Sequence, residues 1–136
     1  MNDILIVDDE RDIRELVSDI LIDEGYITRL AGNSDSAMRQ MREQRPSVLI
    51  LDIWLKDSLM DGIDILKFVK SNYPEVPVVI ISGHGNIEIA VAAIKQGAFD
   101  FIEKPFNLDQ LTVTVNRAAE VSSLRLENSV LRSQYS

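Results

Sequence analysis

The chain of 136 residues contains no cysteine, and it has only one histidine and one tryptophan. The lack of cysteine excludes disulfide bonds and thiolate metal sites, and it fits a reducing compartment. Apolar runs are all too short to span a bilayer, and the N-terminus lacks the basic and apolar regions of a signal peptide. We therefore expect a protein of the cytoplasm that makes no contact with membranes.

Positive charge is also scarce. The 14 lysines and arginines are outnumbered by 22 aspartates and glutamates, and the formal net charge is −8. A surface of this sign repels phosphate backbones and anionic headgroups. This segment is therefore not expected to bind nucleic acid by itself.

Short apolar runs that end in polar residues dominate the pattern, and helix-length stretches separate them. Such runs are typical of buried parallel strands in a βα alternation. Right-handed crossovers then give a doubly wound α/β fold of the flavodoxin type, a (βα)5 sheet with strand order 2-1-3-4-5. The predicted strands are 4–7, 26–30, 47–52, 76–81 and 99–102.

The stretches between and after these strands carry apolar residues at helical spacing, which predicts a helix after each strand. Gly25 is placed to end the first helix, and either Asn107 or Asp109 to cap the last. The apolar faces are Ile13, Leu16, Val17, Ile20 and Leu21; Ala37, Met38 and Met41; Ile65, Leu66 and Val69; Ile87, Val91 and Ile94; and Leu108, Leu111, Val115 and Ala118.

From residue 121 the apolar spacing changes to a repeat of 3.5 residues, which is typical of a coiled coil. An asparagine at a core position, here Asn128, sets the register of two-stranded coiled coils. We therefore divide the chain into a domain at 1–120 and a helical extension or linker at 121–136. The extension is either a dimerising coiled coil or a solvated helical tail. Its repeat positions are Val121, Leu124, Asn128, Leu131 and Tyr135.

The strand ends predict a functional site, because the carboxyl ends of parallel strands meet at one edge of the sheet. Asp8 and Asp9 follow the first strand and Asp52 ends the third. Three carboxylates without imidazole or thiolate suit Mg²⁺, or Mn²⁺, better than zinc. Without a cation they would repel and raise one another's pKa values. The alternative for Asp8 and Asp9 is a helix cap with favourable charge at a helix N-terminus.

Ser82 and Lys104 end or follow the other two strands at this edge. An ammonium can neutralise a transferring phosphoryl group, or it can simply pair with Asp52. Ser82 can donate to a phosphoryl oxygen, with Gly83 leaving space beside it, or it can cap a helix. Lys104–Pro105 is a candidate cis peptide bond. A carboxylate such as Asp52 is an established nucleophile that forms an acyl phosphate.

Together these residues resemble the receiver domain of two-component response regulators, whose fold is CheY-like, over residues 1–120. The family's pattern has paired acids after the first strand, a phosphoacceptor ending the third, a hydroxyl ending the fourth, an aromatic residue in the fifth and a Lys-Pro pair after it. The matching residues are Asp8, Asp9, Asp52, Ser82, Phe101, Lys104 and Pro105, with Met60-Asp61-Gly62 and Gly97-Ala98 at their usual places.

The resemblance implies that Asp52 accepts a phosphoryl group from a histidine kinase with Mg²⁺. It implies that Ser82, Gly83 and Lys104 hold the phosphoryl oxygens, and that Ser82 and Phe101 move together as a switch. The surface of residues 86–120 would then change, and it is the usual face for a homodimer. Such a domain is a signalling module, not an enzyme, beyond assisting its own phosphorylation and dephosphorylation. The implied metal ligands are Asp9, Asp52, the backbone carbonyl of Trp54 and, through water, Asp8.

Two features depart from the usual pattern. The loop after Asp52 is longer than usual and lacks its customary proline. Bulky Trp54 and His84 stand at the positions that tune phosphate lifetime in this family; His84 either contacts the phosphoryl group or is an exposed loop residue. The loop, the segment 52–55 and the segment 82–88 resemble the NtrX subgroup of nitrogen regulators.

The NtrX resemblance implies an NtrY-like sensor histidine kinase as the phosphodonor. In a full-length regulator it also implies an ATPase domain that works with σ54-RNA polymerase and a domain that binds DNA. The chain has no Walker or helix-turn-helix motif. We therefore expect a receiver with its linker, which controls transcription through domains that are absent here.

Three other classes of protein share parts of this pattern. A flavodoxin-like FMN binder needs a phosphate loop after the first strand, where this chain has acids that repel phosphate. A haloacid-dehalogenase-type phosphatase needs a second aspartate at position 54, which is Trp54. A receiver that acts by protein contact without phosphorylation remains the main alternative.

Overall fold

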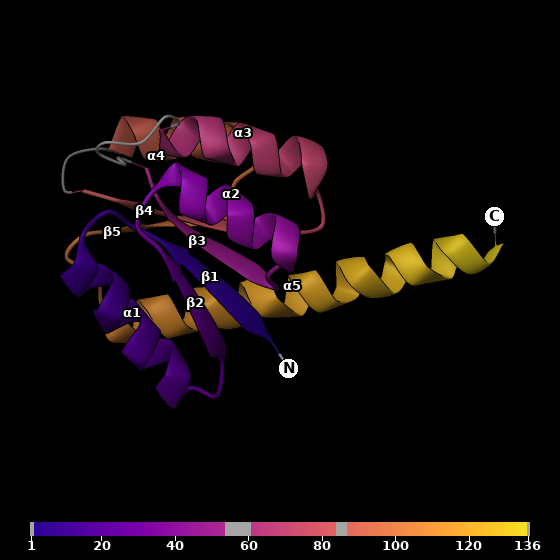
Figure 1. Cartoon of the computed structure of the whole chain (residues 1–136), viewed down its shortest axis with the longest axis horizontal. Helices are drawn as coiled ribbons and strands as arrows, with labels where there is room; N and C mark the ends of the chain where they lie inside the picture. Colours follow the sequence, from indigo (N-terminus) through magenta and orange to yellow (C-terminus); the bar gives the residue numbers. More distant parts are fainter. Residues whose placement is uncertain (1, 54–60, 84–86, 136) are drawn as a thin grey trace.

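Five parallel strands form one sheet in the order β2-β1-β3-β4-β5, which confirms the predicted topology (Figure 1). The computed structural model describes residues 2–53, 61–83 and 87–135, with side chains up to residue 125. The strands are β1 (Asp3–Val7), β2 (Ile27–Ala31), β3 (Val48–Asp52), β4 (Val78–Ser82) and β5 (Asp100–Glu103). The helices are α1 (Arg11–Asp23), α2 (Ser34–Glu43), α3 (Gly62–Asn72), α4 (Ile87–Lys95) and α5 (Leu108–Tyr135).

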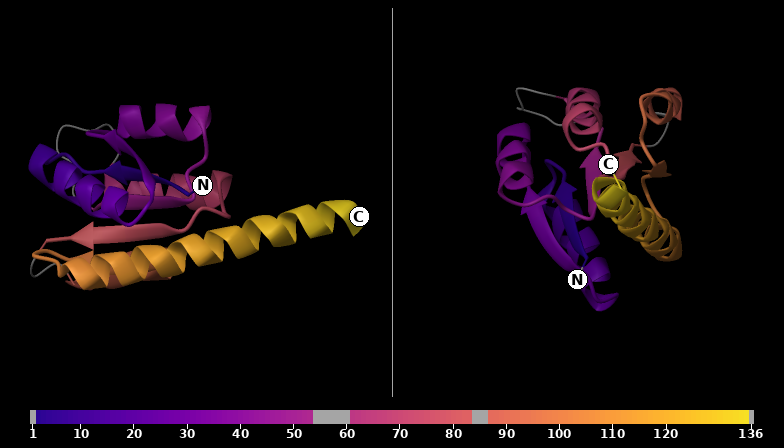
Figure 2. Two further views of the ribbon diagram at one scale, coloured as in Figure 1. Left: turned by 90° about the horizontal axis from the view of Figure 1, so that it is seen from below. Right: turned by 90° about the vertical axis from the view of Figure 1, so that its right-hand side faces the viewer.

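Both faces of the sheet are buried, because helices cover each of them. Helices α2, α3 and α4 lie on one face, and α1 and α5 lie on the other (Figures 1 and 2). In β1, Leu5 and Val7 pack toward α2 and α3, whereas Ile4 and Ile6 pack toward α1 and α5. The alternation of a strand therefore fills two cores, which explains why its sequence is continuously apolar.

Strand boundaries differ from the predicted ones by one or two residues, for identifiable reasons. β2 starts at Ile27 instead of Tyr26, because the Tyr26 N–H donates to Leu21 O at the end of α1. Gly25, with φ of 96°, makes this helix end possible. β4 starts at Val78 instead of Val76, after Pro77, which has no N–H for a ladder.

The starts of α2, α3 and α5 are capped by short polar side chains. Asn33 accepts from Ser36 N and Asp61 accepts from Asp64 N, both at 2.9 Å. Of the two predicted caps of α5, Asn107 fills the role, because its Oδ1 accepts from Asp109 N at 2.7 Å. These bonds satisfy N–H groups that have no partner within the helix.

The last helix is far longer than the others and continues past the edge of the sheet (Figure 2). Leu111, Val115 and Ala118 pack on the sheet, whereas Leu124 is exposed. Leu108, predicted on the packed face, is also exposed, at the first residue of the helix. The division of the chain at residue 120 and the coiled coil remain predictions. In the part of the chain that the structure describes, no helix is both long enough and apolar enough to cross a membrane.

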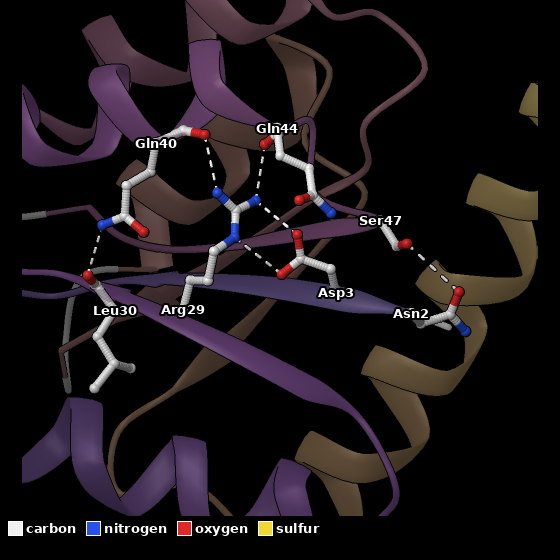
Figure 3. A network of polar contacts seen from close by, with 7 residues as sticks. All are labelled: Asn2, Asp3, Arg29, Leu30, Gln40, Gln44 and Ser47. Atoms are coloured by element: carbon white, nitrogen blue, oxygen red, sulfur yellow. Dashed lines mark hydrogen bonds and ion pairs between the residues drawn. The ribbon is translucent and has the colours of Figure 1, made fainter.

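An ion pair between Arg29 and the buried Asp3 ties β1, β2 and α2 together (Figure 3). Arg29 donates to both carboxylate oxygens of Asp3, at 3.1 and 2.7 Å, and also to the carbonyl oxygens of Gln40 and Gln44 at the end of α2. One planar guanidinium thereby binds a buried carboxylate and two carbonyl oxygens at the end of a helix, of which that of Gln40 also accepts from Gln44 N. The network stabilises the sheet edge and is separate from the strand ends that carry the site.

Candidate functional site

The carboxyl ends of the central strands bring buried polar side chains together, as the sequence predicts. Asp8 is 0% exposed, Asp52 4% and Ser82 1%. These three residues lie close together because β1 and β4 both pair with β3, whose last residue is Asp52. Buried groups of this kind are costly unless they are paired or used.

Lys104 is the cation at the centre of this group. Its Nζ lies 3.4 Å from Asp8 Oδ2, 3.4 Å from Asp52 Oδ2 and 3.6 Å from Glu10 Oε1. Burial alone lowers the pKa of Lys104, but attraction by Asp52, Asp8 and Glu10 outweighs it, so the pKa lies above its ordinary value. The side chain is therefore a permanent ammonium beside Asp52.

Asp8 is the most desolvated acid of the group. Its Oδ1 accepts from Glu10 N at 2.8 Å. Its Oδ2 has no hydrogen-bond partner among the described residues, although Lys104 lies beside it as an ion pair. Burial raises the pKa of Asp8, and the Glu10 N–H and Lys104 oppose this only partly. A further cation at this carboxylate would relieve the cost of its burial.

Ser82 joins the group from β4. Its Oγ is buried and has no hydrogen-bond partner among the described residues. Its carbonyl accepts from Lys104 N at 2.7 Å, which fixes the backbone of Lys104 beside β4. The Lys104–Pro105 peptide bond is cis, as predicted. Phe101 in β5 is half-buried and packs against the core under α2, α3 and α4.

Three acids come together after β1. Asp8, Asp9 and Glu10 each offer a carboxylate oxygen, and these oxygens lie within 4.8 Å of one another. Oxygen ligands of this charge, with one buried carboxylate oxygen left without a hydrogen bond, fit Mg²⁺ or Mn²⁺. Sequence reasoning missed Glu10, although the Asp-Asp-Glu run was the available signal. The N-cap residue of α1 is Glu10, whose side chain makes no cap bond. The alternative of a cap role for Asp8 and Asp9 is not contradicted, because Asp8 Oδ1 accepts from the Glu10 N–H.

Gly62 has a role that its sequence pattern does not reveal. A Cβ added there would lie 2.5 Å from Ile53 Cα and 2.7 Å from Asp52 O. Only glycine allows the start of α3 to pass so close to the end of β3. Of the predicted site residues, Gly83 follows Ser82 at this edge, whereas Trp54 and His84 lie outside the described residues.

These features define a class of protein, and the comparison with known families agrees. Residues 4–116 match the response regulator receiver domain family, and the chain belongs to this family. A receiver domain is a signalling module and not a classical enzyme.

Several relatives of the chain within this family are NtrX proteins. The chain is 58% identical over 126 residues to the nitrogen assimilation regulatory protein NtrX of Azorhizobium caulinodans, covering 93% of this chain and 28% of that protein. A crystal structure of NtrX from Brucella abortus has 54% identity and a TM-score of 0.91, covering 96% of this chain and 30% of that one. The crystal structure of the receiver domain of Brucella abortus NtrX has 55% identity and a TM-score of 0.85, covering 86% of this chain and 98% of that one. The chain thus spans less than a third of the length of the longer relatives.

Proposed function

We propose that Asp52 is the phosphoacceptor of a two-component signalling switch. The observation that supports this most is the position of Lys104, whose ammonium lies 3.4 Å from Asp52 and whose backbone is bonded to Ser82. A carboxylate at a strand end, a fixed cation and a buried hydroxyl are groups that suit phosphoryl transfer to an acid.

In this proposal an oxygen of Asp52 forms a bond to phosphorus while the bond between phosphorus and the donor's imidazole nitrogen breaks. Bound Mg²⁺ supplies positive charge that neutralises the phosphoryl oxygens and the acidic carboxylates. Asp8, Asp9 and Asp52 would hold the metal, together with the carbonyl of Trp54. Lys104 and the Ser82 hydroxyl would hold phosphoryl oxygens, and Lys104 would exchange its contact with Asp8 for one of these oxygens. Gly83 leaves space beside Ser82.

The phosphodonor would be a sensor histidine kinase of the NtrY type. An apolar hollow of about 380 Å³ opens beside the site, lined by Ile13, Leu16, Lys104, Pro105 and Phe106. A protein donor must approach Asp52 at this edge of the sheet, and Lys104 borders both the hollow and the acid. We therefore place the apolar contact of the kinase in this hollow.

Phosphorylation would act on the surface of α4, β5 and α5 through Ser82 and Phe101. This surface exposes Val113 of α5 and Ile87, Val91 and Ile94 of α4. The sequence pattern predicts these three as the apolar face of α4, but the buried residues of this helix are Ala90 and Ala93. Exposed apolar side chains in one region are typical of a protein interface. The proposed result is a homodimer that controls transcription in nitrogen regulation through ATPase and DNA-binding domains, working with σ54-RNA polymerase.

The decisive experiment is the intact mass of the protein after incubation with acetyl phosphate or a phosphorylated kinase, with and without Mg²⁺. We expect one phosphoryl adduct that needs Mg²⁺, is removed by hydroxylamine and is absent from Asp52→Asn. Asp35→Asn is the matched control, because Asp35 is an exposed acid of α2 outside the site. Folded protein that binds Mg²⁺ but forms no adduct with either donor would contradict the proposal and favour a receiver that acts without phosphorylation.

A further inference from the structure

The side chain of Arg14 in α1 contacts the turn that carries Asp8, Asp9 and Glu10. Arg14 Nη1 donates to the backbone carbonyl oxygen of Asp8 at 2.7 Å. Arg14 belongs to the first turns of α1, and its own N–H donates to Glu10 O at 3.0 Å. Backbone and side chain of Arg14 therefore hold both ends of the segment Asp8 to Glu10, which carries the three clustered acids.

We propose that Arg14 is a positioning residue for Mg²⁺ binding, which acts by fixing the peptide between Asp8 and Asp9. The carbonyl that it holds belongs to this peptide, so the bond fixes where the side chain of Asp9 starts. Mg²⁺ requires near-ideal octahedral geometry, and small rotations of a ligand-bearing peptide cost affinity. The inference rests on the proposed function only for the step from metal binding to phosphorylation.

Gly32, directly after β2, provides a second and independent observation. A Cβ added at Gly32 would lie 3.0 Å from Arg14 Nη1, the same nitrogen that bonds Asp8 O. The guanidinium therefore lies against Gly32, where the lack of a side chain leaves it room. Gly32→Ala would shift the guanidinium by a few tenths of an ångström without removing its charge or its donors.

Charge alone predicts the opposite effect on metal affinity. Arg14 is a cation near a site for a cation, so loss of its charge reduces repulsion and would tighten Mg²⁺ binding. Loss of a positioning bond weakens Mg²⁺ binding, and outer partners of this kind typically change metal affinity by roughly tenfold or more. The sign of the change in Kd therefore separates the two effects.

The experiment measures the Kd of Mg²⁺ by titration calorimetry, and the phosphorylation rate by acetyl phosphate as a function of Mg²⁺, for wild type, Arg14→Gln, Arg14→Lys and Gly32→Ala. Arg11→Gln is the matched control, because Arg11 lies on the same helix, is exposed and pairs only with Glu15 among the described residues. Thermal unfolding with a chelator monitors the fold.

For Arg14→Gln we expect Mg²⁺ to bind roughly tenfold more weakly, with a phosphorylation rate at saturating Mg²⁺ within about twofold of wild type. Gly32→Ala should change the Kd in the same direction, Arg14→Lys should restore part of the affinity, and Arg11→Gln should not weaken binding. An Arg14→Gln protein that binds Mg²⁺ as tightly as wild type, or more tightly, overturns the inference. If the wild type binds Mg²⁺ but accepts no phosphoryl group, the proposed function fails, while the calorimetric comparison still decides the role of Arg14.

Discussion

Lys104 Nζ lies 3.4 Å from Asp52 Oδ2, and the same nitrogen is equally far from Asp8 Oδ2. One ammonium therefore compensates two buried carboxylates that lie at the ends of different strands. In this arrangement Lys104 contacts the same acids that a metal and a phosphoryl group would engage in the proposed function. Removal of Lys104 separates its structural role from its role in phosphorylation.

We expect Lys104→Met to lower the free energy of unfolding by about 2 to 4 kcal/mol in the presence of a chelator, because it leaves buried carboxylates without their cation. Mg²⁺ should stabilise the variant more than the wild type, since the metal replaces the lost charge. Urea unfolding with and without Mg²⁺ measures both effects. Lys67→Met is the control, because Lys67 is exposed on α3. Equal stability of Lys104→Met and wild type with a chelator would show that the ion pairs contribute nothing.

The raised pKa of Asp8 predicts how the free energy of unfolding depends on pH. Its pKa is raised by burial, so the folded protein binds this proton more tightly than the unfolded chain does. The negative charge of Asp8 therefore lowers the free energy of unfolding, and this cost is complete at pH values above the pKa of the folded state. The cost is lost as the pH falls toward the ordinary pKa of 3.8.

Without divalent metal we expect Asp8→Asn to be more stable than wild type at pH 7, by about 1 kcal/mol. The advantage should vanish at acidic pH, where Asp8 is protonated in both states. Mg²⁺ should reverse the order at pH 7, because it stabilises only the protein that retains the ligand. Chemical unfolding between acidic and neutral pH, with a chelator and then with Mg²⁺, tests this. A variant less stable than wild type at pH 7 with chelator would refute the assigned cost of burial.

Much of this architecture follows from local sequence rules. Short continuous apolar runs predict the strands, right-handed crossovers predict the doubly wound sheet, and the shared edge of parallel strands predicts that Asp52, Ser82 and Lys104 meet. The bond from Arg14 to Asp8 O and the contact of Glu10 with Lys104 were not predictable. Both contacts depend on the directions in which long side chains point. The apolar pattern of the sequence shows which residues face away from the core, but not these directions.

The ion pair of Arg29 with Asp3 was also unpredictable. It depends on the direction of the long Arg29 side chain, which joins β2 to the start of the neighbouring strand β1. Its partners at the end of α2 are backbone carbonyls, which carry no sequence signal. The start of β2 likewise depended on a bond from Tyr26 N to Leu21 O that no propensity specifies. Sequence reasoning therefore reaches groups at strand ends but not contacts made between side chains and distant backbone.

The Arg29 network predicts a change of stability without a change at the site. Arg29→Met should lower the free energy of unfolding by about 3 kcal/mol, because Asp3 would be buried without its partner. By contrast, Arg11→Met should leave the free energy of unfolding nearly unchanged, because the Arg11 and Glu15 side chains are 78% and 52% exposed and water screens their attraction. Unfolding in urea gives both values.

Titration calorimetry should give the same Kd of Mg²⁺ for Arg29→Met as for wild type, since the network lies apart from the strand ends that carry the acids. In the double variant Asp3→Asn with Arg29→Met, the loss should be smaller than the sum of the single losses. Additive losses would show that Asp3 and Arg29 do not depend on each other. A weakened Mg²⁺ affinity would show that the edge of the sheet is coupled to the site.

Gly62 predicts a change in both stability and function. A Cβ at this position would lie 2.6 Å from Ile53 O and 2.7 Å from Asp52 O, so backbone atoms and not flexible side chains must move. We expect Gly62→Ala to cost about 3 kcal/mol, at the upper end for overpacking, and to shift the peptide that follows Asp52. Phosphorylation by acetyl phosphate should slow by about tenfold or more in protein that is still folded, because the acid is displaced from Lys104.

Gly25→Ala is the control for this substitution. Gly25 has φ of 96°, but a Cβ there would meet nothing within 4 Å. Alanine should therefore cost about 1 to 2 kcal/mol through backbone strain alone. Because Gly25 ends α1 far from Asp52 in the fold, its variant should be phosphorylated at the wild-type rate at a temperature where both are folded. If both variants slowed phosphorylation equally, the loss would follow from general destabilisation, and the contact between Gly62 and the end of β3 would have no special role in placing Asp52.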